Sequence, residues 1–225
     1  MIARLLPAAV ALCAAAVLVS LAVPRFVAGA IVAPYEDLTR AIARGASVPM
    51  RDIDAAREAA NVSLGWLKYG RTLTRLGALE LVHAGQVKTA AEQAAALARG
   101  QASLRAGLAR TPGESYHWLQ LAQTVQATGG ATPALNAPLR MSLRTGAYDH
   151  RLILPRLAIA FRAWPALDAD VRAAMTPQIR RAVDTAPAAL ARLTRRSFAL
   201  RHVRQALEGS PVHAARFAIV WSAPL

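Results

Sequence analysis

Cysteine is almost absent from this chain of 225 residues. Cys13 is the only one, and it lies inside a long apolar run near the N-terminus. A single cysteine excludes an intramolecular disulfide and a cysteine-rich zinc site. The chain is therefore no small disulfide-stapled extracellular scaffold, and side-chain packing alone must hold its folded part together.

Lysine is nearly absent as well, although the net charge is +14. Lys68 and Lys88 are the only lysines, so arginine carries the charge, beside a large excess of alanine. That pairing is typical of codon bias in a GC-rich genome and favours solvated helix faces over a dedicated site. Attraction to anionic lipid headgroups or to an acidic polysaccharide stays open. No nucleic-acid-binding motif is present, so nucleic acid is not an expected partner.

Catalytic signatures are also missing. The chain has no G-x-S-x-G, H-E-x-x-H, G-x-x-x-x-G-K-[ST] or G-x-G-x-x-G motif. Asp168 and Asp170 are the nearest approach to a carboxylate pair, but on one helix they point about 200° apart and are better explained by helix capping. The histidines are scattered and lack metal-ligand spacing; they are His83, His117, His150, His202 and His213. The sequence predicts no enzyme, with no catalytic residue, cofactor or metal site.

A long apolar run is the clearest feature of the N-terminus. Residues 5–24 carry no charge, and roughly 20 residues at 1.5 Å each span a hydrocarbon core of about 30 Å. We favour a transmembrane anchor over residues 1–30, followed by an exported helical domain over residues 31–225. A cleaved signal peptide, with a small-residue site at residues 28–30, is the alternative. Either way, the domain is expected in the periplasm; with an anchor it is held at the inner membrane. Arg4 and Arg25 flank the run symmetrically and hardly decide its orientation.

After this run the apolar residues recur at helical spacing, and no segment alternates as a strand does. The fold class predicted is all-α, with one domain after the anchor. A final basic helix is expected over residues 187–207, and residues 216–221 as a tail packed on it or a short strand. Thr176 and Pro177 predict a helix start. The aromatic residues are expected mostly in the core.

A repeat-like junction lies in the middle of the chain. Gly100, Leu104, Gly107 and Pro112 follow the small-large-small-Pro spacing of the second helix of a tetratricopeptide repeat. Trp118, Leu121 and Ala122 follow the pattern of the first helix of the next repeat, with Val125 in place of the usual tyrosine. Such repeats are stacked helical hairpins that bind other proteins. The predicted domain is a degenerate stack of this kind.

The densest basic cluster falls within the last long helix. Its members, a possible anion-binding set for an acidic glycan or for lipid headgroups, are Arg192, Arg195, Arg196, Arg201 and Arg204. They spread around much of the helix, which favours simple solvation over a single binding stripe.

Several blocks between residues 104 and 183 resemble a group of bacterial proteins. The blocks are residues 104–112, Trp118 to Ala122, residues 139–146, and residues 157–162 followed by Trp164 and Leu167-Asp168. The group comprises membrane-anchored, tetratricopeptide-like proteins associated with exopolysaccharide or capsule biosynthesis, of the VpsP type. This resemblance implies a non-enzymatic scaffold whose partners are proteins of a polysaccharide assembly or export machine. It supplies no catalytic residues.

Overall fold

The computed structural model describes residues 2–222, and every regular element in that range is helical. The all-α prediction is confirmed for these residues. The chain divides into two compact units, residues 1–110 (unit 1) and residues 111–225 (unit 2). The single domain expected after the anchor stays a prediction. The division falls beside Pro112, which cannot donate a backbone hydrogen bond to continue a helix.

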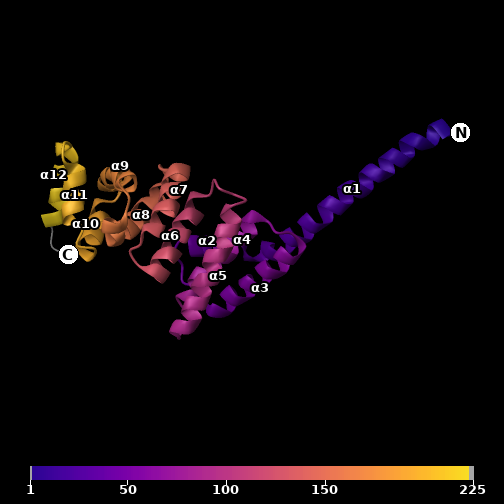
Figure 1. Ribbon diagram of the computed structural model, residues 1–225, viewed down its shortest axis with the longest axis horizontal. Coiled ribbons are helices and arrows are strands. Elements are labelled where there is room, and N and C mark those ends of the chain that lie inside the picture. Colours follow the sequence, from indigo (N-terminus) through magenta and orange to yellow (C-terminus); the bar gives the residue numbers. More distant parts are fainter. Residues whose placement is uncertain (1, 223–225) are drawn as a thin grey trace. The chain divides into compact units, whose positions relative to one another are not determined.

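Unit 1 consists of five α-helices joined by short turns (Figure 1). They are α1 (Ile2–Val32), α2 (Glu36–Ala43), α3 (Met50–Trp66), α4 (Gly70–Ala84) and α5 (Ala90–Leu108). The turn Ala33–Tyr35 between α1 and α2 is a 3-10 helix. A capping box starts α5, in which Thr89 and Glu92 each bond the other's backbone N–H.

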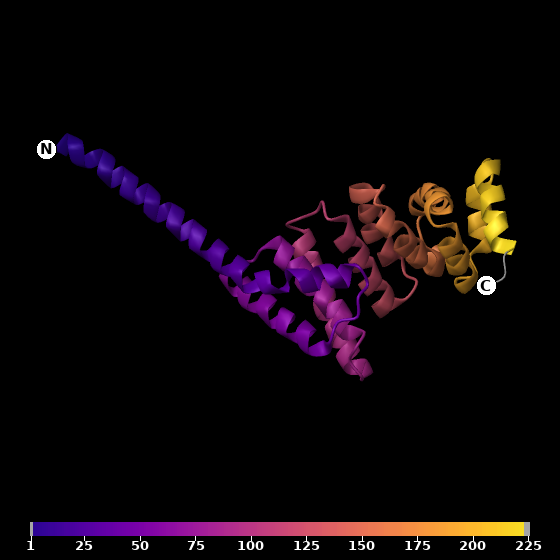
Figure 2. The ribbon, with the colours of Figure 1, turned by 180° about the vertical axis from the view of Figure 1, so that it is seen from behind.

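The long helix α1 is apolar and mostly exposed. Its first part lies clear of the other helices of unit 1 in both views (Figures 1 and 2), and side chains such as Leu12 and Leu18 are 73% and 67% exposed. By length and composition it is able to cross a membrane. The helix continues to Val32, so the boundary expected at residue 30 falls inside it.

The base of α1 packs against α3. Ala28 is buried, and the hydroxyl of the fully buried Ser63 donates to the Ala28 carbonyl oxygen over 2.9 Å. Beyond it, Val48, Ile53, Ala56 and Leu79 form a small core under α2. These contacts join the apolar helix to the folded part of unit 1.

Unit 2 is a second set of helices, coloured from pink to yellow in Figure 1. They are α6 (Ser115–Gly129), α7 (Asn136–Gly146), α8 (His150–Ala163), α9 (Ala169–Thr185), α10 (Pro187–Arg196), α11 (Leu200–Leu207) and α12 (Pro211–Ser222). The side chain of Asn136 bonds the Asp168 N–H (2.8 Å) and the Ala166 carbonyl (3.1 Å), which fixes the α8–α9 connection.

The C-terminal part of unit 2 differs from the sequence prediction. The single helix expected over residues 187–207 is two helices, α10 and α11, separated at Phe198. Residues 216–221 are not a strand: they pack on the preceding helices, as the alternative expected, but as part of a further helix, α12, which Pro211 starts and which buries Phe217. The start predicted at Thr176-Pro177 is wrong too, since α9 runs through both residues.

Candidate protein-interaction site

The glycines of the repeat-like junction lie where two helices approach closely. In unit 1, a Cβ added to Gly107 would lie 2.6 Å from Thr74 Cγ2 and 2.8 Å from the Gly70 carbonyl oxygen of α4. Gly100 of α5 faces Gly77 of α4 in the same way. Leu104 of α5 also packs against Gly77 and is fully buried. The small residues of this spacing therefore allow close packing of the two helices within the α4–α5 hairpin.

This packing predicts opposite effects for two glycine substitutions in unit 1. Gly107→Ala is expected to cost a net 1–2 kcal/mol, roughly, because overpacking outweighs the gain in helix propensity. Gly65→Ala in α3 meets no atom within 4 Å and is expected to stabilise by about 0.5–1 kcal/mol. Urea unfolding followed by circular dichroism measures both. Equal effects of the two substitutions would contradict the close approach.

The other half of the junction lies in unit 2. Leu121 and Ala122 are buried, as expected, whereas Trp118 is only half-buried and its indole N–H donates to the Pro112 carbonyl oxygen over 2.8 Å. The junction therefore straddles the division between the two units. The tetratricopeptide-like stack remains a prediction.

The five arginines of the basic cluster do not share one role. Arg195 is held by α12: its guanidinium bonds the Trp221 carbonyl oxygen and lies 4.6 Å above the indole ring. The other four are exposed and form no ion pair among the described residues; they are Arg192 and Arg196 on α10 and Arg201 and Arg204 on α11. The structure thus leaves four of the five available to a ligand.

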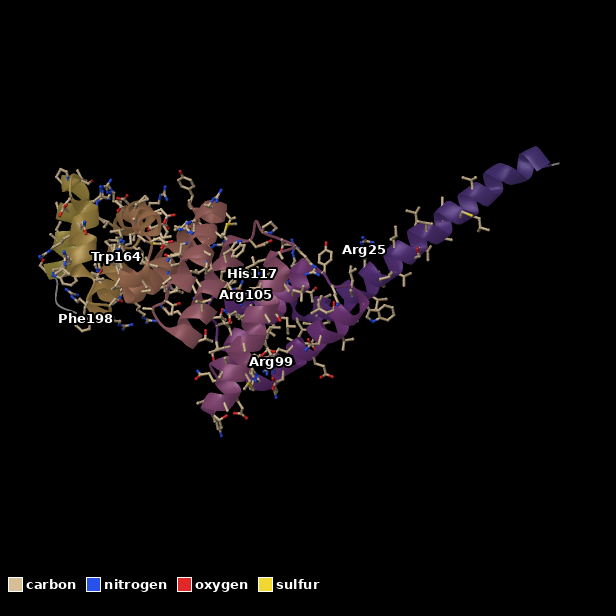
Figure 3. All side chains as sticks on the ribbon, in the orientation of Figure 1. Arg25, Arg99, Arg105, His117, Trp164 and Phe198 are labelled. Carbon is tan, nitrogen blue, oxygen red and sulfur yellow. The ribbon has the colours of Figure 1, made fainter. Side chains whose placement is uncertain are left out.

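Phe198, between α10 and α11, is the most unusual residue of this region. It has φ +53° and is 93% exposed (Figure 3). The Ala199 N–H bonds the Thr194 carbonyl and the Phe198 N–H bonds the Arg195 carbonyl, which is the Schellman pattern of a helix C-terminus. Phe198 occupies the left-handed position that glycine normally takes.

Unit 1 contains the same motif with the usual residue. At the end of α2, Gly45 has φ +81°, and the Ala46 N–H bonds the Ala41 carbonyl. A bulky residue in this conformation costs of order 1–3 kcal/mol. At Phe198 that cost is not offset by burial, because the ring is almost fully exposed.

A largely apolar groove of about 480 Å³ lies between α11 and α12. Leu200, two residues after Phe198, lines it together with Leu207, Phe217 and Trp221. Arg204 and Glu208 are the charged residues of its lining. Phe198 does not line the groove itself; we call the groove and the exposed ring of Phe198 jointly the C-terminal face. No protein-family model, curated protein or solved structure matches this chain.

The two acidic residues considered above as a pair behave differently from expectation. Asp168 precedes α9 and makes no side-chain cap bond. Its carboxylate and that of Asp170 converge on Arg140, with N···O distances of 2.9 and 2.6 Å. The hydrogen bonds from Arg140 hold the pKa of Asp170 below its usual value. The prediction that the two carboxylates point apart is wrong, because Asp168 lies outside α9.

The expectation of core aromatics holds for some residues only. Phe161 is buried, but Trp66 and Tyr69 of unit 1 are 52% and 54% exposed. The ring of half-buried Trp164 stacks on His202 of α11, with centroids 4.3 Å apart. Among the described residues, no three histidines, cysteines or carboxylates gather where they could hold a metal ion.

The His202–Trp164 stack predicts a pH dependence. Burial, aided by the nearby Arg201 and Arg172, lowers the pKa of His202. The folded state therefore disfavours the protonated ring, and its stability falls as the pH drops through the unfolded-state pKa of about 6.5. Hydrogen-exchange protection of α11 should decrease between pH 7 and pH 5, relative to His202→Phe, which keeps a ring but cannot titrate. Identical pH profiles would refute this effect.

Two buried charged residues were not anticipated. Glu80 of α4 is 3% exposed and bonds Arg57 and Arg99, and Arg156 of α8 is completely buried. Each follows an apolar run, LGAL for Glu80 and LILP for Arg156. For both residues, a charged residue within an otherwise apolar stretch was the sequence feature that could have predicted a buried charge.

Proposed function

We propose that the protein is a single-pass membrane protein of the inner membrane whose helical part, in the periplasm, is a non-enzymatic scaffold. The scaffold binds a protein component of envelope polysaccharide assembly or export. The exposed apolar helix α1 supports an anchor. The resemblance to VpsP-type proteins, carried by blocks such as Trp118 to Ala122, supports the polysaccharide process.

The proposal rests mainly on the left-handed backbone and the exposed ring of Phe198. Glycine or asparagine would relieve its left-handed backbone, and the exposed ring gains nothing from burial in the chain itself. Strain of this kind concentrates at functional sites. Aromatic side chains are also frequent hot spots when a partner buries them. Phe198 is thus best explained as a residue that a partner covers.

The chemistry of the C-terminal face describes that partner. The groove between α11 and α12 suits an apolar helix edge, and the exposed Arg201 and Arg204 of α11 suit carboxylates beside it. We therefore assign as occupant an amphipathic segment with acidic flanks, belonging to another protein of the machine.

The substitution Phe198→Asn separates function from folding. It is expected to leave unfolding unchanged or to stabilise by up to about 1 kcal/mol, because asparagine tolerates the left-handed conformation. After mild detergent extraction, the wild-type chain should co-purify with envelope polysaccharide proteins, and Phe198→Asn should lose them at least fivefold. Tyr148→Asn, also exposed and in unit 2, is the matched control. Recovery of no such protein, or equal recovery by all three chains, would count against the proposal.

A second candidate function rests on the four exposed arginines of α10 and α11. They would bind an acidic glycan or anionic headgroups by charge alone. Such binding must weaken steeply between low and high salt. Affinity independent of salt would eliminate this alternative.

A further inference from the structure

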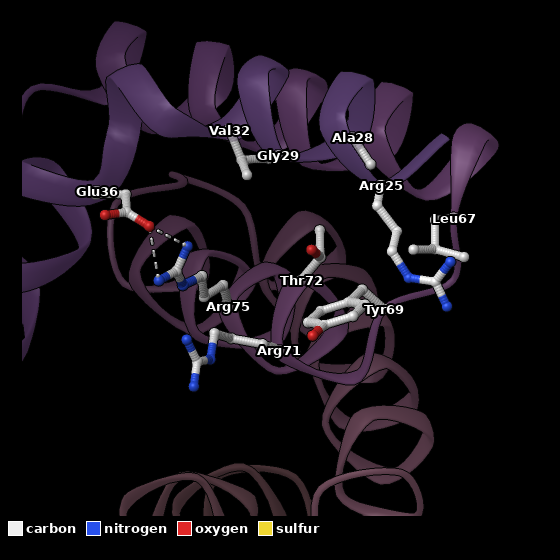
Figure 4. A pocket seen from close by; sticks show the side chains of 10 residues that line it. All are labelled: Arg25, Ala28, Gly29, Val32, Glu36, Leu67, Tyr69, Arg71, Thr72 and Arg75. Carbon is white, nitrogen blue, oxygen red and sulfur yellow. Dashed lines mark hydrogen bonds and ion pairs between the residues drawn. The ribbon is translucent and has the colours of Figure 1, made fainter. Parts of the chain in front are cut away.

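A pocket of about 240 Å³ lies at the base of α1 in unit 1 (Figure 4). One wall is α1, with Arg25, Ala28, Gly29 and Val32. The other comes from the α3–α4 loop and the first turns of α4, with Leu67, Tyr69, Arg71, Thr72 and Arg75. Glu36 closes one end. The pocket is therefore built entirely within unit 1, on the helix that the proposed function places in the membrane.

The position of the pocket along α1 matches the headgroup layer of a bilayer. Arg25 is the first charged residue after the uncharged run of residues 5–24. From Arg25 to Val32 the helix rises roughly 10 Å at 1.5 Å per residue. The polar layer on each side of the hydrocarbon core is about 5–8 Å thick. Most of the pocket would thus lie at the depth of lipid phosphates.

Exposed aromatic residues surround the same position. Phe26 of α1 is 76% exposed, and Trp66, the last residue of α3, and Tyr69 in the loop that follows are about half exposed. Tryptophan and tyrosine favour the membrane–water boundary, because each ring has an apolar body and a polar tip. Ser63, one turn before Trp66, bonds the Ala28 carbonyl and holds this loop beside α1. The exposure of these rings, which contradicts a core role, is what an interfacial role requires.

The pocket also carries uncompensated positive charge. Glu36 pairs with Arg75, whose two terminal nitrogens lie 3.3 and 3.2 Å from one carboxylate oxygen, as the dashed lines in Figure 4 show. Arg25 bonds only the Leu21 carbonyl (2.7 Å), and Arg71 forms no ion pair among the described residues. Both side chains are exposed. Two guanidinium groups therefore remain for an anion.

In Figure 4 the guanidinium groups of Arg25 and Arg71 lie on opposite sides of Tyr69, so both exposed side chains must swing inward to share one anion. We propose that this pocket binds the phosphate of an anionic phospholipid in that way, with Arg25 and Arg71 as its ligands and Trp66 and Tyr69 seated in the surrounding interface. Guanidinium groups suit phosphate because their planar donors bond two oxygens at once. The lipid would fix unit 1 against the membrane surface, so that the α3–α4 loop faces the headgroups. This inference depends on the anchor and not on the identity of the protein partner.

The test uses the full-length protein in detergent micelles, titrated with phosphatidylglycerol and observed by native mass spectrometry. The wild type should bind one lipid tightly, and phosphatidylcholine more weakly. Arg25→Gln/Arg71→Gln should weaken phosphatidylglycerol binding by roughly tenfold or more, since each arginine near an anionic surface contributes roughly fivefold. The control Arg105→Gln/Arg110→Gln removes two exposed arginines of the same unit outside the pocket and should bind as the wild type does.

Three results would overturn the inference. Equal weakening by the two double variants would indicate general charge attraction. Equal binding of inorganic phosphate and of phosphatidylglycerol would indicate a site for a free anion. In vesicles, lipids brominated near the headgroup should quench wild-type tryptophan emission more than that of Trp66→Phe, with Trp221→Phe as control. Unchanged quenching in Trp66→Phe would place the loop away from the interface.

Discussion

Replacing Arg156 by alanine is expected to destabilise unit 2 by about 4 kcal/mol. The guanidinium bonds both the hydroxyl (3.0 Å) and the carbonyl oxygen (2.6 Å) of Ser142, and Nη1 lies 3.5 Å from Gln178 Oε1. Ser142 in turn donates to the Ser115 carbonyl. One side chain on α8 thus ties together α6, α7 and α9. Alanine would leave both a cavity and unpaired acceptors.

The burial of Arg156 is costly in itself. It lowers the pKa of Arg156 to about 10, so the guanidinium stays charged at neutral pH without a carboxylate in contact. Arg156→Met should recover about half of the loss, because methionine fills the volume but donates no hydrogen bond. Arg162→Ala, exposed on the same helix, should change stability by less than about 0.5 kcal/mol. Hydrogen exchange of the α7–α9 amides measures all three, and a loss below about 1 kcal/mol for alanine would contradict this role.

Replacing Glu80 by glutamine is expected to destabilise unit 1 by about 3 kcal/mol. One carboxylate oxygen accepts two bonds from Arg57 (3.0 and 2.8 Å), and the other accepts two from Arg99 (3.2 and 3.1 Å). The glutamine side chain has the same shape, but its amide N–H donors would face the N–H donors of one of the two guanidinium groups. Removing one partner of a buried ion pair is strongly destabilising for this reason.

The matched control is Asp37→Asn, which makes the same change of charge in a highly exposed pair with Arg40. Exposed pairs contribute little, so its effect should be close to zero. The readout is exchange protection of α4 and α5, where about 3 kcal/mol corresponds to a decrease of roughly 150-fold in globally protected amides. Similar losses for both variants would show that burial of Glu80 is unimportant.

The all-α fold class could be predicted from the sequence because it depends on local periodicity, and the small-residue spacing in α5 marks the place where α4 approaches closely. Prediction from the sequence failed where an unusual residue takes a common structural role. The break between α10 and α11 was missed because Phe198, and not glycine, adopts the left-handed conformation. At the end of α2 the same position is taken by Gly45, the residue type that normally marks such a break.

The candidate sites were harder to predict, because they depend on contacts between distant parts of the chain. Asp168 and Asp170 converge on Arg140 of α7 because the α7–α8 and α8–α9 connections bring these distant residues together, and residue spacing in the sequence does not reveal this. Arg195 belongs to the basic cluster in sequence, yet α12 holds it. The exposed Trp66 and Tyr69 follow an apolar helical pattern that normally indicates a core, and only their place beside α1 distinguishes them.

Site-specific photo-crosslinking tests whether the C-terminal face binds a protein of envelope polysaccharide assembly, as we propose. A photoreactive residue at position 198 of the full-length, membrane-inserted chain should yield one dominant adduct with such a protein. The same residue at position 148, also exposed in unit 2, should not yield that adduct. No adduct at position 198, or the same adducts at both positions, would show that the C-terminal face does not bind this partner.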